Sequence, residues 1–303
     1  MTIRSLTLIA LATATTTAFA ASDNFNKTLN VTGAPTISVS TGSGYIHVST
    51  GSQSEVRINA KVSSEHGWFG GHGSDEDRVK QIVANPPIVQ NGNAITIGPN
   101  GSDWNQFRNI EIDYDITLPA ATTLKVGTGS GDVEVANVVN LVSAQTGSGD
   151  VHLNNIGSAP HVSTGSGTIR AEGVHGIANL ETGSGDIELH QEQAGDVKAQ
   201  TGSGTIRLHG VNGGVRAGTG SGDLEIDGNP ASEWKIETGS GSVRLNLNNA
   251  KYMLNASTSS GSINVSAPID KQSSLNKEHI VGAVRGGGPS VRVSTGSGDI
   301  TVR

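Results

Sequence analysis

Four side chains that could coordinate a metal ion lie close together near the N-terminal end of the chain. They are His66, His72, Asp75 and Asp77. Imidazole nitrogens and carboxylate oxygens are common ligands of zinc and other divalent ions. Glycines surround the two histidines, however, and their spacing fits no regular element. We therefore favour a solvated loop that leads into a helix, with a metal site as the alternative.

Aromatic side chains gather in the same part of the chain. Trp68, Phe69, Trp104 and Phe107 lie between residues 63 and 109, whereas aromatic residues make up only 3% of the whole sequence. Exposed aromatic rings in recognition sites stack on sugars or peptides, so these four residues are candidate ligand-binding residues. The competing interpretation, which we favour, is a small core that seals one side of the fold.

Glycine-rich segments with serine and aspartate recur along the chain and could suggest phosphate, nucleophile or calcium chemistry. Residues 128–132, for example, read Thr-Gly-Ser-Gly-Asp. A phosphate loop does not fit, because a strand follows where a helix is needed and no lysine is placed for the phosphate. The serine is also not in a nucleophile elbow. Calcium solenoids of the Gly-x-Gly-x-Asp type are a closer alternative, but Thr168, Thr205 and Ser242 replace the aspartate in alternate repeats.

The period of these segments predicts a stack of coils. The threonine that opens the repeat stands at Thr128, Thr146, Thr164, Thr182, Thr201, Thr219 and Thr238, in steps of 18 or 19 residues, with outlying copies at Thr41, Thr258 and Thr295. A fixed period of this size is typical of repeats that bury their apolar faces only by stacking. We predict an all-β fold, a β-solenoid (β-helix) with coils of about 18 residues and, by the usual crossover rule, right-handed winding.

Two alternating apolar pairs in each repeat predict two strands per coil. One pair follows the glycines, as in Val133 and Val135, and the other precedes the threonine, as in Val142 and Ala144. Side chains alternate along a strand, so the threonines point inward with the apolar pairs that precede them. This argues against an ice-binding face, which would need a row of threonines on the surface. The glycines are expected to form corners that need a positive φ or close backbone approach. They are Gly129, Gly131, Gly147, Gly149, Gly165, Gly167, Gly183, Gly185, Gly202, Gly204, Gly220 and Gly222.

Outward positions after the glycines alternate in charge from coil to coil. Arg170 falls between His152 and Glu188, and Arg207 falls between Glu188 and Glu225. Stacked strands lie about 4.8 Å apart, so this order makes each contact attractive. We expect each exposed pair to contribute only about 0.2–1 kcal/mol.

The repeat is interrupted near each end. We expect the first solenoid strands in residues 21–62 and an insertion at 63–109, which holds a loop, a helix from Ser74 to about Ala84, and a hairpin of 88–90 with 94–97. The regular solenoid follows at 110–266, then a loop excursion at 267–290 and a final coil at 291–303. That coil needs the excursion as a cover, or its free edge is a place where two chains could associate.

The first twenty residues are typical of a secretory signal peptide. Arg4 precedes an apolar stretch, and Ala18, Phe19 and Ala20 fit a cleavage site. We expect an exported chain from Ala21, in the periplasm, at the cell surface or secreted, with no later membrane-spanning segment. The net charge of -7 without a basic cluster argues against nucleic acid as a partner, and the absence of cysteine excludes disulfides and thiolate sites. No cofactor is expected.

The unit Gly-Ser-Gly-Asp-Val-x-Val, repeated behind a signal peptide and present again at residues 296–303, resembles the bacterial putative-adhesin family of exported β-strand-repeat proteins. The function of that family is unknown. The resemblance covers most of the mature chain and implies a β-helical fold and a cell-envelope location, without catalytic residues. We therefore expect a non-enzymatic adhesin or interaction scaffold that binds a cell-surface glycan or protein. The alternative is a carbohydrate-binding or polysaccharide-active solenoid that uses residues 63–109.

Overall fold

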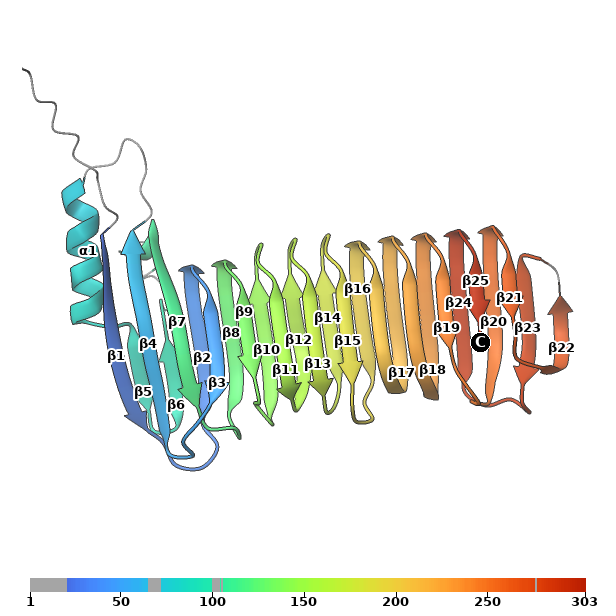
Figure 1. Ribbon diagram of the computed structural model, residues 1–303, viewed down its shortest axis with the longest axis horizontal. Coiled ribbons are helices and arrows are strands. Elements are labelled where there is room, and N and C mark those ends of the chain that lie inside the picture. The colour runs from blue at the N-terminus through green and yellow to red at the C-terminus, as the bar shows by residue number, and fades with distance from the viewer. Residues whose placement is uncertain (1–20, 65–71, 100–103, 105, 276) are drawn as a thin grey trace, which may run out of the picture.

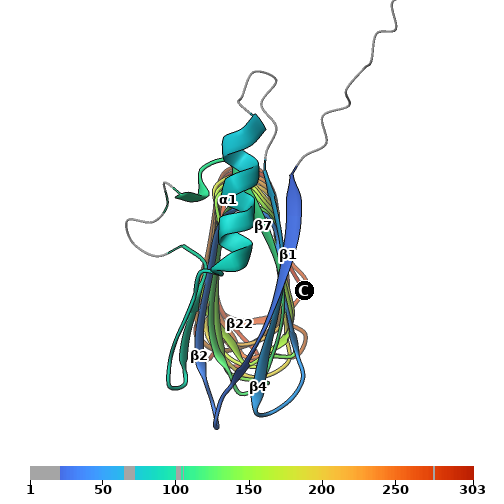
Figure 2. The same cartoon turned by 90° about the vertical axis from the view of Figure 1, so that its left-hand side faces the viewer.

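The chain folds into a long stack of β-strands with helix α1 at its N-terminal end, as the computed structural model shows (Figure 1). Residues 21–64, 72–99, 104, 106–275 and 277–303 are described. Viewed from the N-terminal end, the strands surround an oval cross-section with two long sides (Figure 2). The predicted all-β fold class is confirmed. No helix in the described part of the chain is long and apolar enough to span a bilayer.

Each coil places one strand on each long side. We call the side formed by the strands before the Gly-Ser-Gly corner the leading face, and the side formed by the strands after it the trailing face. In stacking order the leading face holds β6 (Ala94–Ile97), β2 (Thr36–Ser43), β8 (Thr123–Ser130), β10 (Leu141–Thr146), β12 (Ser158–Thr164), β14 (Ala178–Thr182), β16 (Val197–Ser203), β17 (Ile206–Ser221), β18 (Leu224–Ser240), β24 (Ser290–Ser297) and β20 (Tyr252–Ser260). The trailing face holds β7 (Ile110–Leu118), β3 (Ile46–Thr50), β9 (Val133–Ala136), β11 (Val151–Ile156), β13 (Ile169–Val174), β15 (Ile187–Gln191), then β17 and β18 again, β19 (Val243–Asn246), β25 (Ile300–Val302) and β21 (Ile263–Val265). Strands β17 and β18 belong to both faces because each continues from the trailing to the leading face.

Parallel pairing keeps equivalent positions of successive coils in line. Val151 lies opposite Val133 on one side and Ile169 on the other, and these partners are 18 residues apart. All three side chains are buried. Because side chains alternate along a strand, the apolar positions of every coil enter one shared core between the two faces. This stacking is what buries the apolar face of each coil.

The corner glycines are needed because successive corners touch through their backbones. A Cβ on Gly147 would stand 2.3 Å from the carbonyl oxygen of Gly129, and one on Gly149 would stand 1.9 Å from that of Gly131. Neither distance leaves room for a side chain. Of the twelve predicted corner glycines, only Gly222 has a positive φ, and its backbone is nearly extended at 159°. Close approach, rather than a left-handed conformation, therefore selects glycine here.

The threonine of each repeat points inward, as the parity of the pattern predicts, and ties one corner to the next. Thr164 is only 5% exposed. Its hydroxyl donates to the carbonyl of Gly149 in the preceding coil at 2.8 Å and accepts from its own coil's Gly167 amide at 3.1 Å. Thr146 and Thr182 make the same pair of bonds. A buried hydroxyl in the core is thereby satisfied.

The repeat aspartates also connect neighbouring coils. Oδ1 of Asp132 accepts a hydrogen bond from the Asp150 amide at 2.8 Å, and Oδ1 of Asp150 accepts one from the Thr168 amide at 2.7 Å. Asp186 and Asp223 accept from the amides of the next coil in the same way. The first role of these carboxylates is therefore to satisfy corner amides. Sequence alone had shown them only as members of a charge pattern.

The N-terminal end of the stack is assembled out of sequence order. Strand β2 lies between β6 and β8, and β3 lies between β7 and β9. Strands β6 and β7 thus belong to a coil of the solenoid, although residues up to 109 were expected to be an insertion. β4 (Glu55–Ser64) and β1 (Ser22–Asn30) extend the trailing face in antiparallel pairs rather than as first coils. They end the parallel stack, because the chain there runs against the direction of the coils.

The hairpin and helix predicted for this region are present. β5 (Ile88–Asn91) pairs with β6 in antiparallel fashion. Helix α1 (His72–Ala84) packs against β1 and β4, with Val79 and Ile82 buried. It begins two residues before the expected cap, Ser74, which therefore lies in the first turn. The residues that lead into the helix, 65–71, are outside the described part of the chain.

The C-terminal end also has a coil inserted out of sequence order. The predicted position of the final coil, at the end of the stack, is therefore wrong. Strand β24 lies between β18 and β20, and β25 lies between β19 and β21. The coil of residues 290–302 is thus interior, and the coil of residues 252–265 is outermost. The expected excursion forms β22 (Ile269–Leu275) and β23 (His279–Val284), and β23 covers β20. Because both edges of β25 are paired, self-association through that coil has no free backbone to use.

Candidate functional site

Two of the four aromatic candidates, Trp104 and Phe107, lie in the described part of the chain, and they differ in exposure. Phe107 is 9% exposed and belongs to the hydrophobic core, as the small-core interpretation requires. Trp104 is 44% exposed. A Cβ placed on Gly42 would stand 3.6 Å from Cζ3 of Trp104, so the indole covers the corner of the 36–50 coil. Trp68 and Phe69 lie outside the described residues.

A second exposed aromatic residue, which the sequence analysis did not single out, follows the same corner. Tyr45 is 49% exposed. Its amide donates to Oδ1 of Asp113 at 3.1 Å, and partial burial together with the carboxylates of Asp113 and Asp115 raises the pKa of its hydroxyl. The side chain therefore remains a hydrogen-bond donor at neutral pH. Beside it, a hollow of 380 Å³ is lined by the glycines and serines of the next corners and by Asp132.

The metal-site hypothesis gains no support from the described residues. His72 and Asp75 belong to the first turn of α1, and Asp77 is exposed on the same helix. His66 is outside the described part of the chain. Within that part, no group of three or more histidine, aspartate or glutamate side chains is arranged to hold a metal ion.

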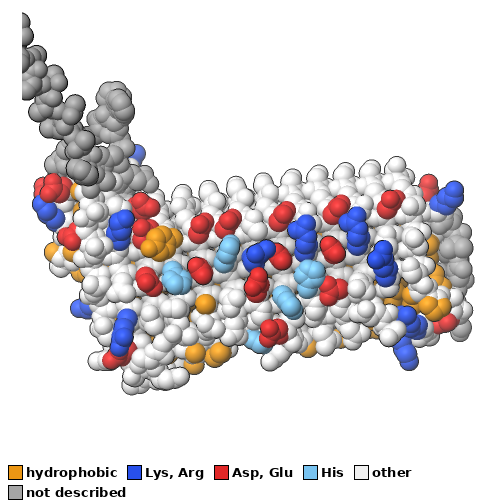
Figure 3. All heavy atoms as spheres, in the orientation of Figure 1, with side chains coloured by type: hydrophobic (Ala, Val, Ile, Leu, Met, Phe, Trp, Pro, Cys, Tyr) orange, Lys and Arg blue, Asp and Glu red, His pale blue; other side chains and the backbone are white. Residues whose placement is uncertain are grey.

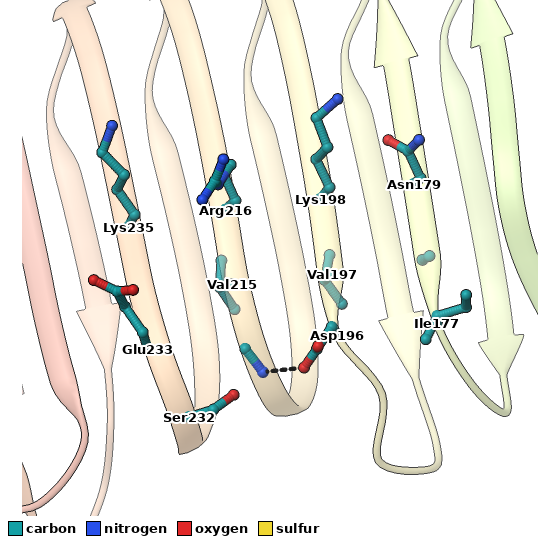
Figure 4. Close-up of a pocket in the computed structure, with 12 residues that line it drawn as sticks. Ile177, Asn179, Asp196, Val197, Lys198, Val215, Arg216, Ser232, Glu233 and Lys235 are labelled. Carbon is teal, nitrogen blue, oxygen red and sulfur yellow. Dashed lines mark hydrogen bonds between the residues drawn. The ribbon is translucent and has the colours of Figure 1, made fainter.

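A groove on the leading face brings together side chains with recognition chemistry (Figure 4). It has a volume of 610 Å³, within the range of small-molecule sites, and it crosses β14, β16, β17 and β18. Its floor consists of Ala178, Val197 and Val215, each 2–3% exposed. Buried Trp234 lies beside it in β18 and donates from Nε1 to the Gly213 carbonyl at 2.8 Å. The groove therefore stands on the packed core of the solenoid.

One side of the groove is a row of cations. Lys198, Arg216 and Lys235 are in register on adjacent strands, and Asn179 continues the row at one end. Figure 4 shows these four side chains projecting from the same side of the strands. On β24, which follows β18 on this face, Arg292 extends the row beyond the groove. Adjacent strands are about 4.8 Å apart, so four like charges follow one another at that spacing.

The other side of the groove carries acceptors. Asp196, Ser232 and Glu233 lie below the row of cations in Figure 4. Oδ1 of Asp196 accepts from the Gly214 amide at 2.7 Å. A Cβ on Gly214 would approach Ser232 Oγ to 2.8 Å, so glycine keeps the space between these side chains open. The upper row is thus suited to an anionic group, and the lower row to hydrogen-bond donors.

Carboxylates pair with three of the four cations, and Arg216 is the exception among the described residues. Lys198 pairs with Glu181. Lys235 pairs with Glu237 at 2.9 Å, and Arg292 pairs with Glu233 at 2.8 Å. Among the described residues, no carboxylate pairs with Arg216, whose side chain is exposed. Its guanidinium stands between two like charges and is free to bind an anion.

The trailing face differs in its charge pattern. Arg170 pairs with Glu188 at 2.5 Å, and His47 stands 3.6 Å from Asp115. Arg207 is in register between Glu188 and Glu225. Figure 3 shows acidic, basic and histidine side chains interspersed along one long side of the molecule. Basic and acidic side chains thus alternate along the trailing face, whereas four cations follow one another on the leading face at the groove.

The groove could have been found in the sequence by counting back from the repeat threonines. Lys198, Arg216, Lys235 and Arg292 each stand three residues before a threonine. The alternating charges that draw attention in the sequence stand instead at the positions after the glycines. The contact between the strands of Lys235 and Arg292 could not be foreseen, since it depends on the out-of-order coil.

Comparison with known proteins identifies the family. A family model described as Toastrack DUF4097 matches residues 71–303. The chain belongs to this family. Toastrack DUF4097 is a domain of unknown function, so membership accounts for the β-solenoid-like architecture and assigns no activity. No curated protein matches the sequence.

Two solved structures are similar to this Toastrack chain. One is a putative cell adhesion protein from Clostridium sporogenes, with 12% identity over 93% of this chain and 98% of that one and a TM-score of 0.24. The other is a putative adhesin from Bacteroides fragilis, with 15% identity over 93% of this chain and 97% of that one and a TM-score of 0.39. At these values neither structure bears on function.

Proposed function

We propose that this protein is an exported, non-enzymatic, adhesin-like β-solenoid that serves as an interaction scaffold of the bacterial cell envelope. The observation that carries the proposal is the groove on the leading face, where ionic and hydroxyl side chains from successive coils stand in register over a packed core. Such a surface positions many weak contacts rigidly, so binding loses little conformational entropy. The right-handed winding expected from crossover rules is part of this proposal.

The signal-like N-terminal residues support the export part of the proposal. Arg4 and the apolar stretch after it precede a small-residue cleavage site at Ala20. Expression of the full chain in a bacterial host, followed by fractionation and N-terminal sequencing, tests this. We expect material outside the cytoplasm that begins at Ala21. A chain retained in the cytoplasm with its first residues intact would contradict it.

The scaffold role is tested by binding and turnover measured on the same protein. The purified full-length chain is applied to arrays of cell-surface glycans and to immobilised envelope and matrix proteins. We expect saturable binding to a restricted set of partners and no product from the bound glycans. Robust turnover of any polysaccharide would overturn the non-enzymatic assignment.

Carbohydrate recognition near the N-terminal end is a second candidate, favoured by the exposure of Trp104 and Tyr45 at one corner of the solenoid. Rings of this kind stack on sugar faces, and the neighbouring serines and Asp132 supply polar groups. Substitution of Trp104 by alanine should then abolish a glycan signal on the array. Unchanged binding in that variant would remove this site as the binding surface.

A further inference from the structure

We propose that the groove on the leading face binds a chain of acidic sugars, with the carboxylate of one uronic acid residue held by Arg216. This inference deepens the scaffold function and rests on it. It follows from the charge of the two rows, from the unpaired guanidinium and from the direction of the groove.

Arg216 selects an anion. Its guanidinium is exposed, lies between Lys198 and Lys235 in register, and has no carboxylate partner among the described residues. Lys198 and Lys235 are each held by a glutamate, Glu181 or Glu237. A bound carboxylate would relieve repulsion along the row and form a two-pronged contact with the fork of nitrogen donors.

The lower row selects hydroxyl groups beside that anion. Asp196 and Glu233 present carboxylate oxygens, and Ser232 presents a hydroxyl, opposite the cations. A ligand with negative charge on both edges, such as polyphosphate or a nucleic acid strand, would be repelled by the two carboxylates. A uronic acid ring carries its carboxylate on one edge and hydroxyl donors on others, so it fits both rows.

The groove runs along the solenoid axis and suits a polymer. Its lining comes from four neighbouring strands, and Arg292 continues the row of cations beyond it. At the other end, Oδ1 of Asn179 is buried without a hydrogen-bond partner. A sugar hydroxyl that reaches this oxygen would supply the missing hydrogen bond. An extended chain can therefore contact successive coils in the same manner.

The test uses purified full-length protein and polygalacturonate in a calorimetric titration at low salt, with three comparison ligands. These are the methyl ester of polygalacturonate, polyglutamate and polyphosphate. We expect polygalacturonate to bind at least about tenfold more tightly than each of them, and its binding to weaken as salt is added. A methyl ester that binds equally well would show that the carboxylate is not recognised. Equal or tighter binding of polyglutamate or polyphosphate would overturn the assignment to an acidic sugar.

Variants locate the site. Arg216→Gln should weaken polygalacturonate binding about tenfold or more, since a charged hydrogen-bonding group is lost. The matched control is Arg207→Gln, which lies on the same strand, β17, but on the trailing face, and should bind within about twofold of the parent. Equal affinities of the two variants would overturn the proposal. Both residues are exposed, so both variants should melt like the parent.

Glu233→Gln separates an acidic sugar from a simple polyanion. If Glu233 accepts from sugar hydroxyls, its neutralisation weakens binding of polygalacturonate. A simple polyanion would bind this variant more tightly, because a carboxylate is removed and Arg292 loses its partner. A rise in affinity would therefore refute the role of the lower row. If the parent binds other partners but polygalacturonate fails, the inference is wrong while the scaffold function stands. Absence of any partner would remove the scaffold function itself.

Discussion

The amide of Thr168 donates a hydrogen bond of 2.7 Å to the carboxylate of Asp150, 18 residues earlier and one coil away. This bond shows how the repeat works. A corner side chain accepts a hydrogen bond from a backbone amide of the next coil. Each coil therefore offers a hydrogen-bond acceptor to the coil that stacks on it. The same principle governs the glycines and threonines of the corner, and it leads to several measurable consequences.

A methyl group at a corner should be far more damaging than one elsewhere in the same repeat. In Gly149→Ala the new Cβ would stand 1.9 Å from the Gly131 carbonyl oxygen, so two backbones must separate. We expect a loss of about 3 kcal/mol or more, measured by urea denaturation. Gly127→Ala is the control, since its Cβ would meet only the Gln145 carbonyl oxygen at 3.8 Å, and its stability should change by less than about 1 kcal/mol. Equal losses in both variants would contradict the close-approach explanation.

Removal of one buried threonine hydroxyl should cost more than removal of its methyl group. Thr164→Val keeps the shape but leaves the Gly149 carbonyl and the Gly167 amide without this partner. The expected loss is about 1–3 kcal/mol in the free energy of unfolding. Thr164→Ser keeps the hydroxyl and should lose about 1 kcal/mol. If the valine variant were as stable as the parent, the hydroxyl would have no stabilising role.

Acid should weaken the end of the solenoid through Asp299. The amide and hydroxyl of Ser262 donate to this carboxylate and lower its pKa. The folded state therefore favours the ionised form, and its contribution is present above about pH 3.9 and lost as the pH falls through the lower folded value. Asp299→Asn keeps an acceptor oxygen without a titrating group. Thermal melts from about pH 5 downward should show the stability difference between parent and variant shrinking, and a constant difference would argue against this linkage.

Reversal of one charge on the trailing face should show whether charged side chains of successive coils interact. Arg207→Glu places three carboxylates on successive strands, between Glu188 and Glu225. We expect a loss of up to about 1 kcal/mol at low salt, reduced at high salt by screening. Arg207→Gln should lose less. A low-salt melt that does not differ from the parent would show that these charges do not interact across coils.

The local structure was largely readable from the sequence, whereas the order of the coils was not. Apolar residues that recur every second position predict the buried face of each strand and the inward threonines. Apolar residues that recur every three to four positions predict the buried helix face of Val79 and Ile82. Residues 290–302, however, carry the same pattern as every other coil. The local sequence does not distinguish the coil that comes next along the chain from a later one. Only the lengths and pairings of the connections place β24 beside β18.

The candidate groove was missed for a related reason. Its cations are spread over four repeats, and each alone is an ordinary surface residue. They become a site only when coils stack in register, and Arg292 joins them only because its coil is inserted beside β18. For the aromatic candidates, the concentration in one segment could be seen in the sequence, but their burial could not. In the structure Phe107 belongs to the core and Trp104 is exposed.

The inserted coils have a consequence for how the molecule is made and how it can change in length. The coil of residues 252–265 cannot dock until residues 290–302 have been synthesised, and the coil of residues 36–50 waits for residues 94–135 on both of its sides. In chain order, every strand of the N-terminal end is therefore present by residue 136, before the middle of the stack, and the C-terminal end is completed last. The coils between residues 141 and 230 take part in neither closure. The number of repeats thus sets the length of the solenoid, and the coils inserted out of sequence order close its two ends.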